Sequence, residues 1–541
     1  MKTVLLLLVV VFGTAVLNTH AATLKPVSLA SGSTIPAVGS SFLPRISSNG
    51  SHVVFISHAR NLVTNDDQRE WLDVFVRDVG SSYSVLASVN TNGLGGGNGN
   101  SGWASFVPGS NLVVFASDAS DLVAGDTNQS YDVFLRDITS QQTRLISADL
   151  NGNSPVDPIP ASIIPLSGNP MATLTAVLFE SRATNLVSTP VSSNSVNIYA
   201  RSLFSNVTEL VSVDTNGNPF AGFCELASVR EKGDRAVFIA RTSPSPLSTS
   251  EVFVRKLGPG ITIHASAAVA DYTNIYRCGS ATISADGEFV TFIAAGLPEG
   301  TVLFRVGIDS SSTVAVATNA LENSPVQISN NGRFVTFTDG TNIFRWDDTT
   351  ASSSLVSANI LGQPIATGTS FNPLSTANGN TILFISNSPE LVQNGSTNHQ
   401  VYSRDMNTGT TRLLTVNAVG TASAGVDFFT ALSIPQSGDY GVLDATTADF
   451  VPSDTNAASD VFLFPIDGPV ARVSLTTTPT GTKSSWIGDP NRSYRVEFKD
   501  DANAPTWSPL NAPITWNGNN ATATDPSNTN AHRYYRAVRL P

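Results

Sequence analysis

The stretch Val113–Gly152 reads VVFASDASDLVAGDTNQSYDVFLRDITSQQTRLISADLNG, and its pattern decides the fold of the chain. An apolar run at Leu112–Ser117 leads through a polar loop to a second run at Asp132–Asp137. A third run follows at Thr143–Ser147, and Gly102–Pro108 upstream has the composition of another short strand. Short runs rich in Val, Phe and Leu and bounded by turn residues indicate strands. The unit is therefore predicted to be four antiparallel strands.

The same unit recurs along most of the chain. Eight segments match the pattern of its third strand. They are Asp73–Asp78, Asp132–Asp137, Asn197–Ser202, Glu251–Lys256, Thr301–Val306, Asn342–Asp347, Gln400–Asp405 and Asp460–Pro465. Repetition at roughly 40–65 residues is the signature of a β-propeller, in which each repeat forms one blade. We predict an all-β fold with eight four-stranded antiparallel blades. The alternative is a ring of seven blades, with one degenerate copy in a linker.

The two ends of the repeat region predict how the ring closes. The last copy stops at Asp467-Gly468-Pro469, and no fourth strand comparable to Arg144–Ser147 follows it. Near the N-terminus, Leu24–Ala30 (LKPVSLA) has the pattern of the missing strand. We expect this segment to complete blade eight, because closure removes the exposed sheet edges that would otherwise pair with other chains.

The recurring motifs S-x-D/N-G, V-x-F, N-L-V, D-T-N and D-V-F-V-R-D resemble the WD40-like, TolB-type propeller repeats of exported bacterial proteins. The resemblance covers about Leu24 to Gly468. It implies a module that binds other macromolecules, and it carries no catalytic residue onto this sequence. Beyond Pro469 the segments SYRVEFKDD, ITWNG and RYYRAVRLP alternate like strands of a small antiparallel sandwich. This part looks like the C-terminal β-modules of secreted bacterial proteins.

The N-terminus has the features of a secretory signal. Lys2 supplies a positive charge, Val4–Phe12 an apolar core, and Ala21 and Ala22 a small-residue cleavage site. We therefore divide the chain into a signal peptide at 1–22, a propeller at 23–468 and a C-terminal module at 469–541. No later segment approaches the ~20 consecutive apolar residues of a transmembrane helix. We expect a monomer that is secreted, periplasmic or held at the cell surface.

The charge pattern narrows the choice of partners. The net charge is −12, and the chain has no basic stripe, which argues against a nucleic-acid partner. The acidic residues are scattered and form no tail.

Two polar loops have the composition of a cation site. Asp126 and Asn128 precede Asp132 with the same spacing as Asp454 and Asn456 before Asp460. Oxygen ligands at short spacing suit Ca²⁺. The alternative, which we prefer, is that these side chains cap turns by accepting hydrogen bonds from nearby backbone N–H groups.

Arginine recurs at the fifth position of the third strand. The six copies are Arg77, Arg136, Arg201, Arg255, Arg305 and Arg404. One residue type at one structural position indicates a shared architectural role. We expect each arginine to tie its blade to the neighbouring one through carboxylates or backbone carbonyls.

The loops between second and third strands differ in length around the ring. They are long in blades one, two, three, seven and eight, and short in blades four to six. In a propeller these loops share a face with the connections between blades, so one face should carry a raised crescent and a lowered sector. Cys224 and Cys278 enter blades four and five on the lowered side, which makes a disulfide between them a reasonable expectation.

Aromatic residues gather where the chain enters the first strands, and these are the candidate binding residues. They are Trp103, Phe223, Tyr276, Phe371 and Phe428. Exposed aromatic rings could stack on sugars or anchor a partner. The alternative is that they pack the junctions between blades.

No nucleophile, paired-carboxylate or phosphate-loop motif is visible, so the sequence names no catalytic residue. The leading hypothesis is an exported, non-enzymatic propeller that binds a protein or a polysaccharide on its loop-rich face. One alternative is a secreted hydrolase or lyase acting on carbohydrate, with catalytic residues scattered among the loops. Another is a structural component of the cell surface.

Overall fold

The computed structural model describes residues 24–539 except for a number of short segments. The gaps are at 66–68, 81–82, 129, 157–169, 246, 268–276, 299, 311, 394, 418–430, 436–437, 439, 453, 457, 467–469, 472–473, 479–480, 488–493, 501–506, 518–519 and 527–532. All strands of the described residues belong to ten four-stranded antiparallel sheets, and these residues contain no α-helix. Among them, no helix has the length and apolar character needed to cross a membrane. The predicted signal peptide lies outside the described residues.

Eight of the ten sheets are built from Lys25–Pro465, and we number them as blades in chain order. Blade one contains β2 (Ser41–Ile46), β3 (His52–Ser57), β4 (Asp73–Asp78) and β5 (Ser84–Leu86). Blade two contains β6 (Ser101–Phe106), β7 (Leu112–Ser117), β8 (Asp132–Asp137) and β9 (Gln142–Leu145). Blade three contains β10 (Met171–Ala172), β11 (Ala176–Ser181), β12 (Asn197–Ser202) and β13 (Thr208–Leu210). Blade four contains β14 (Phe223–Val229), β15 (Arg235–Arg241), β16 (Ser250–Lys256) and β17 (Ile261–His264).

The second half of the ring repeats this order. Blade five contains β18 (Arg277–Ile283), β19 (Phe289–Leu297), β20 (Gly300–Gly307) and β21 (Thr313–Ala317). Blade six contains β22 (Gln327–Ile328), β23 (Phe334–Thr338), β24 (Ile343–Asp347) and β25 (Ser352–Leu355). Blade seven contains β26 (Ser370–Ser375), β27 (Thr381–Ser386), β28 (Gln400–Asp405) and β29 (Thr410–Leu413). Blade eight takes β30 (Leu432–Ser433), β31 (Tyr440–Ala445) and β32 (Asp460–Pro465) from the end of the region, and β1 (Lys25–Pro26) from its start.

The strand from the N-terminus closes the ring, as the sequence predicts. β1 pairs antiparallel with β32, so that Lys25 faces Leu463 and Pro26 faces Phe462. The pairing continues beyond β1, because the Val27 N–H donates to the Val461 carbonyl at 2.7 Å. The first and last strands of the propeller therefore share one sheet, and no edge of blade eight is left open on this side.

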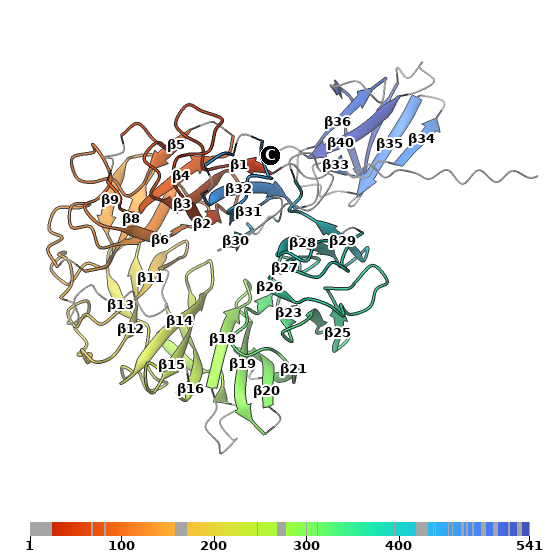
Figure 1. Cartoon of the computed structure of the whole chain (residues 1–541). Helices are drawn as coiled ribbons and strands as arrows, with labels where there is room; N and C mark the ends of the chain where they lie inside the picture. The colour runs from red at the N-terminus through yellow and green to blue at the C-terminus, as the bar shows by residue number, and fades with distance from the viewer. Residues whose placement is uncertain are drawn as a thin grey trace, which may run out of the picture.

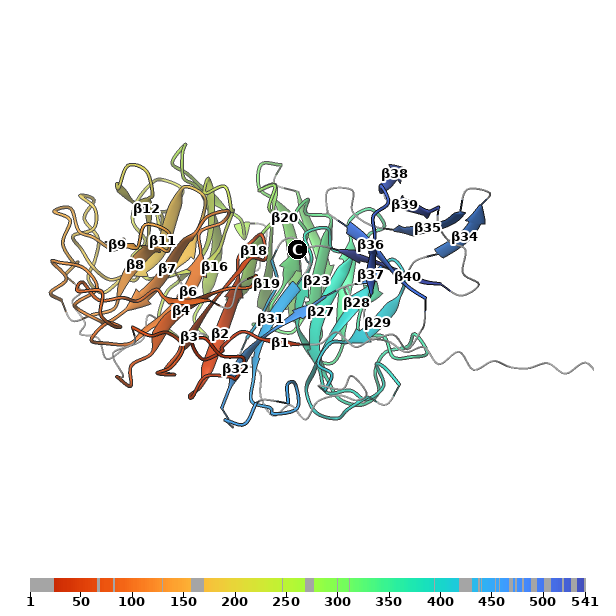
Figure 2. The same cartoon turned by 90° about the horizontal axis from the view of Figure 1, so that it is seen from above.

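Alternation along each strand explains why consecutive sheets pack face to face. In β3, Val53 and Phe55 pack in one core cluster with residues of blade eight, whereas Val54 and Ile56 pack in another with Phe115 of blade two. Successive side chains of a strand point to opposite faces of its sheet, so a central strand that is apolar throughout can bury both faces. The same division holds at every junction, since each of eight core clusters joins two consecutive blades. The result is a closed ring of sheets (Figure 1) whose strands run between two opposite faces (Figure 2).

The loops between second and third strands have the predicted lengths. The long ones span residues 58–72, 118–131, 182–196, 387–399 and 446–459. The loop of blade four is shorter, at 242–249, and blades five and six have only 298–299 and 339–342. The long loops are anchored, because a buried small residue and a buried large one recur in them, such as Ala59 and Leu62 in blade one.

A repeated set of hydrogen bonds joins each of four long loops to the preceding connection between blades. In blade one, the Asn61 carbonyl accepts from the Ser31 N–H at 2.7 Å and its side-chain Oδ1 accepts from the Val38 N–H at 2.9 Å. Asp121, Asn185 and Glu390 form the same pair of bonds in blades two, three and seven. We call these four residues the loop clamps. They show that the loops and the connections between blades share one face, which we call the loop-rich face.

The C-terminal region contains the remaining two antiparallel sheets. One consists of β33 (Val470–Ala471), β40 (Tyr534–Arg539), β36 (Tyr494–Lys499) and β37 (Ser508–Leu510). The other consists of β34 (Ser474–Thr478), β35 (Gly481–Ile487), β39 (Asn520–Asp525) and β38 (Thr515–Asn517). Their buried side chains form a core of their own, which contains Trp486, Val496, Ala521, Ala523 and Ala537.

Candidate functional site

Asp132 and Asp460, two of the predicted cation ligands, occupy a repeated structural position. The Ser147 hydroxyl donates to Asp132 Oδ1 at 2.5 Å and accepts from the Val133 N–H at 3.0 Å. Other blades have the same arrangement between a residue at the start of the third strand and a hydroxyl residue just after the fourth strand. The pairs are Asp73 with Ser88, Asn197 with Ser212, Asn342 with Ser357, Gln400 with Thr415 and Asp460 with Ser28. We call this arrangement the strand latch. It gives both aspartates a structural role within their blades.

Asn128 and Asn456 cap turns, in agreement with the interpretation that we preferred. Asn128 Oδ1 accepts from the Ser130 N–H at 3.0 Å, and Asn456 Oδ1 accepts from the Ala458 N–H at 2.8 Å. Their amide groups also reach the adjoining connections between blades. Asn128 Nδ2 donates to the Pro155 carbonyl at 2.9 Å, and Asn456 Nδ2 donates to the Ala37 carbonyl at 2.8 Å.

Asp126 and Asp454 are the aspartates of the two sets that lie outside the strand latch. They are only 6% and 5% exposed, and burial raises the pKa of both carboxyl groups. Asp126 Oδ1 and Asp454 Oδ2 are buried without a hydrogen-bond partner among the described residues. The same is true of the Oδ2 atom of Asp132, whose Oδ1 accepts from Ser147. Among all the residues that the structure describes, no three His, Cys, Asp or Glu side chains are grouped so that they could hold a metal.

Calcium binding at these two loops stays a prediction, and thermal unfolding tests it. If turn capping and latching are the roles of these residues, the unfolding midpoint is expected to be the same in EDTA and in excess Ca²⁺. A stabilisation by Ca²⁺ would instead follow from binding to the folded state. Such a shift would establish a site if Asp126→Asn and Asp454→Asn together abolish it, and if a control variant, Asp339→Asn in the short loop of blade six, retains it.

The recurring arginines make a different contact from the predicted one. Five of the six donate to a hydroxyl on the fourth strand of their own blade, at 2.9–3.1 Å. The pairs are Arg77 with Ser84, Arg136 with Thr143, Arg201 with Thr208, Arg255 with Thr262 and Arg404 with Thr411. The strand register explains these contacts, because each arginine lies directly opposite its partner. The expectation of ties between blades is wrong for these five.

Arg305 is the exception among the six. The residue opposite it is Val314, which has no hydroxyl. Its guanidinium reaches blade six instead, where Nε donates to the Gly332 carbonyl at 2.7 Å and the two NH₂ groups contact Asp348 at 3.2 Å. The predicted tie between neighbouring blades is therefore confirmed for Arg305.

Cys224 and Cys278 are free thiols, so the predicted disulfide is absent from the structure. They lie at equivalent positions of β14 and β18, the first strands of blades four and five. Cys224 packs in the core between blades three and four, whereas Cys278 packs in the core between blades four and five. Blade four thus separates the two sulfur atoms. Burial raises the pKa of both thiols to about 12, which keeps them protonated and unreactive.

Three of the five predicted aromatic binding residues lie within the described residues. Trp103 packs edge-on against Tyr131 with ring centroids 5.4 Å apart, and Phe371 packs edge-on against His399 at 5.3 Å. The Phe223 ring lies 5.5 Å from the guanidinium of Arg182.

These three aromatic residues come from blades two, four and seven, are half-buried, and each packs on a loop between second and third strands. The contacts fit the alternative interpretation, in which they pack the structure. Tyr276 and Phe428 lie outside the described residues, so a binding role for the set stays a prediction.

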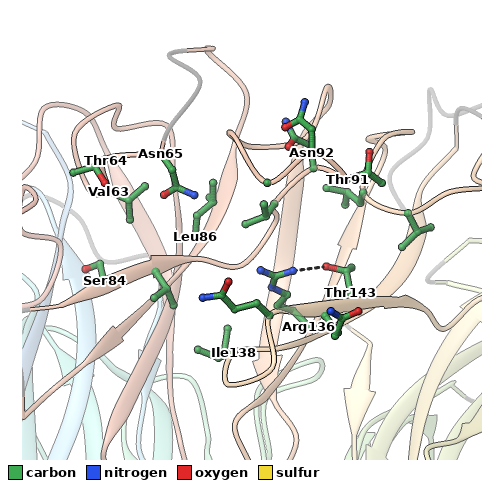
Figure 3. A pocket seen from close by; sticks show the side chains of 18 of the residues that line it. Val63, Thr64, Asn65, Ser84, Leu86, Thr91, Asn92, Arg136, Ile138 and Thr143 are labelled. Atoms are coloured by element: carbon green, nitrogen blue, oxygen red, sulfur yellow. Dashed lines mark hydrogen bonds between the residues drawn. The ribbon is translucent and has the colours of Figure 1, made fainter.

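The structure instead shows a polar cleft between blades one and two, with a volume of about 510 Å³. Its lower part is formed by β5, by Arg136 of β8 and by the start of β9. The loops at 63–65 and 122–124 and the turn at 90–93 also line the cleft. Figure 3 shows Asn65 and Asn92 at the top and Arg136 below, bonded to Thr143. A volume of this size is in the range of pockets that hold small ligands.

The side chains that line this cleft are mainly neutral hydrogen-bonding groups. Exposed amides and hydroxyls predominate, namely Asn65, Asn92, Gln141, Gln142, Thr64 and Thr91. Tyr83 adds an aromatic ring, and this residue is 66% exposed. The one cation, Arg136, is engaged with Thr143, and burial lowers the pKa of its guanidinium. The cleft can therefore offer many hydrogen bonds, an aromatic surface and little free charge.

Sequence reasoning missed this cleft because its residues do not form a motif. Tyr83 and Gln142 belong to the turns and edges of outer strands, where polar residues are ordinary. They come together only because blades one and two are neighbours in the ring. The sequence signal that could have drawn attention to the cleft is the single aromatic residue at this position of the turn. Blades two to seven have Gln142, Val207, Ile261, Thr313, Ser352 and Thr410 there.

No family model matches the chain, and a search of curated proteins finds no match. Among solved structures, the chain is similar to a prolyl endopeptidase, with 12% identity, a TM-score of 0.42, and coverage of 89% of this chain and 57% of the endopeptidase. It thus spans little more than half of that protein. The chain is also similar to TolB from Acinetobacter baumannii, with 13% identity and a TM-score of 0.29. This likeness covers 62% of this chain and 76% of TolB. The β-propeller domain of the Trilobed protease from Pyrococcus furiosus has 10% identity and a TM-score of 0.37, and the likeness covers 70% of this chain and 98% of that domain.

At such identities a likeness concerns the fold alone. The prediction of an all-β propeller fold is confirmed by the repeated four-stranded antiparallel sheets.

Proposed function

We propose that this protein is a non-enzymatic recognition module that binds a carbohydrate chain in the cleft between blades one and two. The observation that carries the proposal is the lining of the cleft. Its exposed amides and hydroxyls match the hydrogen-bonding capacity of sugar hydroxyls, and Tyr83 offers a face on which a sugar ring can stack. The signal-like N-terminus supports recognition outside the cytoplasm, in the periplasm, at the cell surface or in the medium.

A second candidate is a protein partner on the loop-rich face, and a specific observation favours it. The connections between blades carry exposed apolar side chains, among them Val38, Leu94, Leu150, Ile360 and Leu361, all at least 63% exposed. Exposed apolar groups of this kind are used in protein contacts. These apolar side chains are spread around the loop-rich face and do not form one patch. The cleft gathers its hydrogen-bonding groups in one concave site, and we therefore prefer a carbohydrate ligand over a protein partner.

A glycan array with purified protein tests the proposal, with release of reducing ends measured on the same samples. Tyr83→Ala is expected to weaken binding about tenfold, because an aromatic platform contributes on the order of 1–2 kcal/mol. Val207→Ala is the matched control, since Val207 holds the equivalent exposed position in the outer turn of blade three. It should bind as the unaltered protein does.

Three results would contradict the proposal. Equal binding by the Tyr83→Ala variant would move the site away from the cleft. Release of reducing ends would show an enzyme. The absence of binding to any glycan would reject the carbohydrate and favour a protein partner on the loop-rich face.

A further inference from the structure

Arg45 lies on β2, the innermost strand of blade one. The first strands of neighbouring blades contact one another, with β6 on one side of β2 and β30 on the other, so that they surround the axis of the ring (Figure 1). Side chains on these strands reach solvent although the strands are central, as Leu43 of blade one and Asn372 of blade seven do. The axis is therefore open to water, and we call this space the central channel.

A bulge directs the side chains of β2. The register between β2 and β3 shifts between Phe42 and Arg45, and Leu43 within the shift has φ 52°. Trp103, Ser280 and Asn372 have left-handed φ angles at the corresponding positions of blades two, five and seven. Bulges of this kind re-aim side chains, and left-handed angles at residues other than glycine carry strain. The chain thus accepts strain where its strands line the channel.

Arg45 is the only charged residue in its ring of equivalent positions. Each first strand has one residue opposite the third residue of the second strand, as Arg45 is opposite Val54. Going around the ring, the equivalent residues are Ser105, Met171, Ser228, Thr282, Gln327, Leu374 and Ser433. Ser105, Ser228 and Thr282 carry half-buried hydroxyls, and Gln327 carries a half-buried amide. Ser433 is buried, and Met171 and Leu374 pack against core clusters. This channel ring therefore combines one cation with several neutral hydrogen-bonding groups.

The guanidinium of Arg45 has no partner among the described residues. Within this part of the chain it forms no hydrogen bond or ion pair, and the residue is exposed to solvent. Its pKa is lowered by burial, and no carboxylate acts against that shift. Arg45 is thus exposed to water and yet surrounded by protein. A side chain that projects into a channel has both properties. Arg45 also differs from the other arginines of the first and third strands. Those arginines form hydrogen bonds with neighbouring residues, as Arg277 does with Glu322.

We propose that Arg45 makes the central channel a binding site for a sugar that carries one carboxylate, such as a uronate residue. A guanidinium pairs with a carboxylate through two parallel hydrogen bonds, and the pair is stronger where water is partly excluded. The hydroxyls and the amide of the channel ring suit the uncharged hydroxyls of the same ligand. A single cation balances a single carboxylate, and the net charge of −12 disfavours a polyanion. This site is separate from the cleft between blades one and two and does not depend on it.

The test compares two arginine variants and two ligands. The probes are xylotriose with a single glucuronate branch and unbranched xylotriose, and binding is followed by calorimetry. Arg45→Gln should weaken binding of the glucuronate probe at least about tenfold. The affinity of Arg45→Lys should lie between those of Arg45→Gln and the unaltered protein, because lysine keeps the positive charge but lacks the paired N–H donors of the guanidinium. Arg412→Gln on the outer strand β29 is the matched control, since it removes the same charge from an exposed position.

The expected pattern is preference for the charged probe, loss in Arg45→Gln and no change in Arg412→Gln. Because Arg45 has no partner among the residues that the structure describes, its variants should unfold at the same temperature as the unaltered protein. Lost binding would then not reflect lost folding. Equal affinity for both probes, or equal loss in the Arg412→Gln control, would reject the proposal. Binding of a peptide with a single aspartate in place of the glucuronate probe would reject the sugar as the ligand. Tyr83→Ala should leave binding of the glucuronate probe in the channel unchanged, which separates this result from the test of the cleft.

Discussion

A chain that starts at Ser31, and so lacks the closing strand, is expected to lose most of the stability of its ring. The segment that would be removed buries the side chains of Leu24, Val27 and Leu29, each worth about 2 kcal/mol. It also supplies the backbone bonds to β32 and the Ser28 hydroxyl that donates to Asp460 at 2.6 Å. With about 1 kcal/mol for each lost hydrogen bond, the total is on the order of 8 kcal/mol. That is comparable to the entire stability of an ordinary domain.

Thermal unfolding and light scattering measure the effect of this truncation. The truncated chain should unfold at a much lower temperature and should associate, because the free edge of β32 can pair with another copy. A chain that starts at Leu24 is the control, since it keeps the closing strand and should behave as the full chain does. If the truncated chain were a monomer with the same unfolding midpoint, β1 would not be the element that closes the ring.

The contribution of Asp460 to the stability of the protein is expected to fall as the pH rises from about 4 to about 7. Burial raises the pKa of its carboxyl to about 7, and the nearby charge of Asp454 acts in the same direction. In the unfolded chain the same group releases its proton near pH ~4. Between these values the folded state holds a proton that the unfolded state has lost, so raising the pH favours unfolding. A difference of about three pH units corresponds to at most about 4 kcal/mol.

Replacing the carboxyl separates Asp460 from the other acids. Asn197 and Asn342 form the strand latch in blades three and six, so an amide is acceptable at this position. Asp460→Asn should unfold with a weaker pH dependence than the unaltered protein, and should be the more stable of the two at about pH 8. Denaturant titrations at about pH 5 and about pH 8 give the comparison. An unchanged pH dependence in the variant would place the titrating group elsewhere.

The fold was accessible from the sequence because its decisive features are local. The third strands Asp73–Asp78, Asn197–Ser202 and Gln400–Asp405 begin and end where the sequence pattern places them. Their apolar residues are buried on both faces, so the pattern reflects packing directly. Closure by Leu24–Ala30 was also predictable, since a four-stranded unit missing its last strand needs a partner of the same pattern.

The site was less accessible, since it depends on distances between blades that a sequence does not contain. Cys224 and Cys278 are equivalent in sequence pattern, but a whole blade lies between them. The arginine contacts depend on which residue stands opposite in the fourth strand, and Val314 in place of a hydroxyl changes the partner of Arg305. The pattern showed that these arginines share a role, but it could not show the direction in which their side chains point.

The loop clamps have a consequence for the thermodynamics of recognition. Asn61, Asp121, Asn185 and Glu390 fix four of the five long loops to the connections beside them before any ligand arrives. The conformational entropy of these loops is therefore lost during folding and need not be lost again on association. A partner that docks on this face meets a preorganised surface, so its backbone should move little between the free and bound states. Affinity for such a partner can then be adjusted by changing single side chains on the turns, without redesign of the ring that holds them.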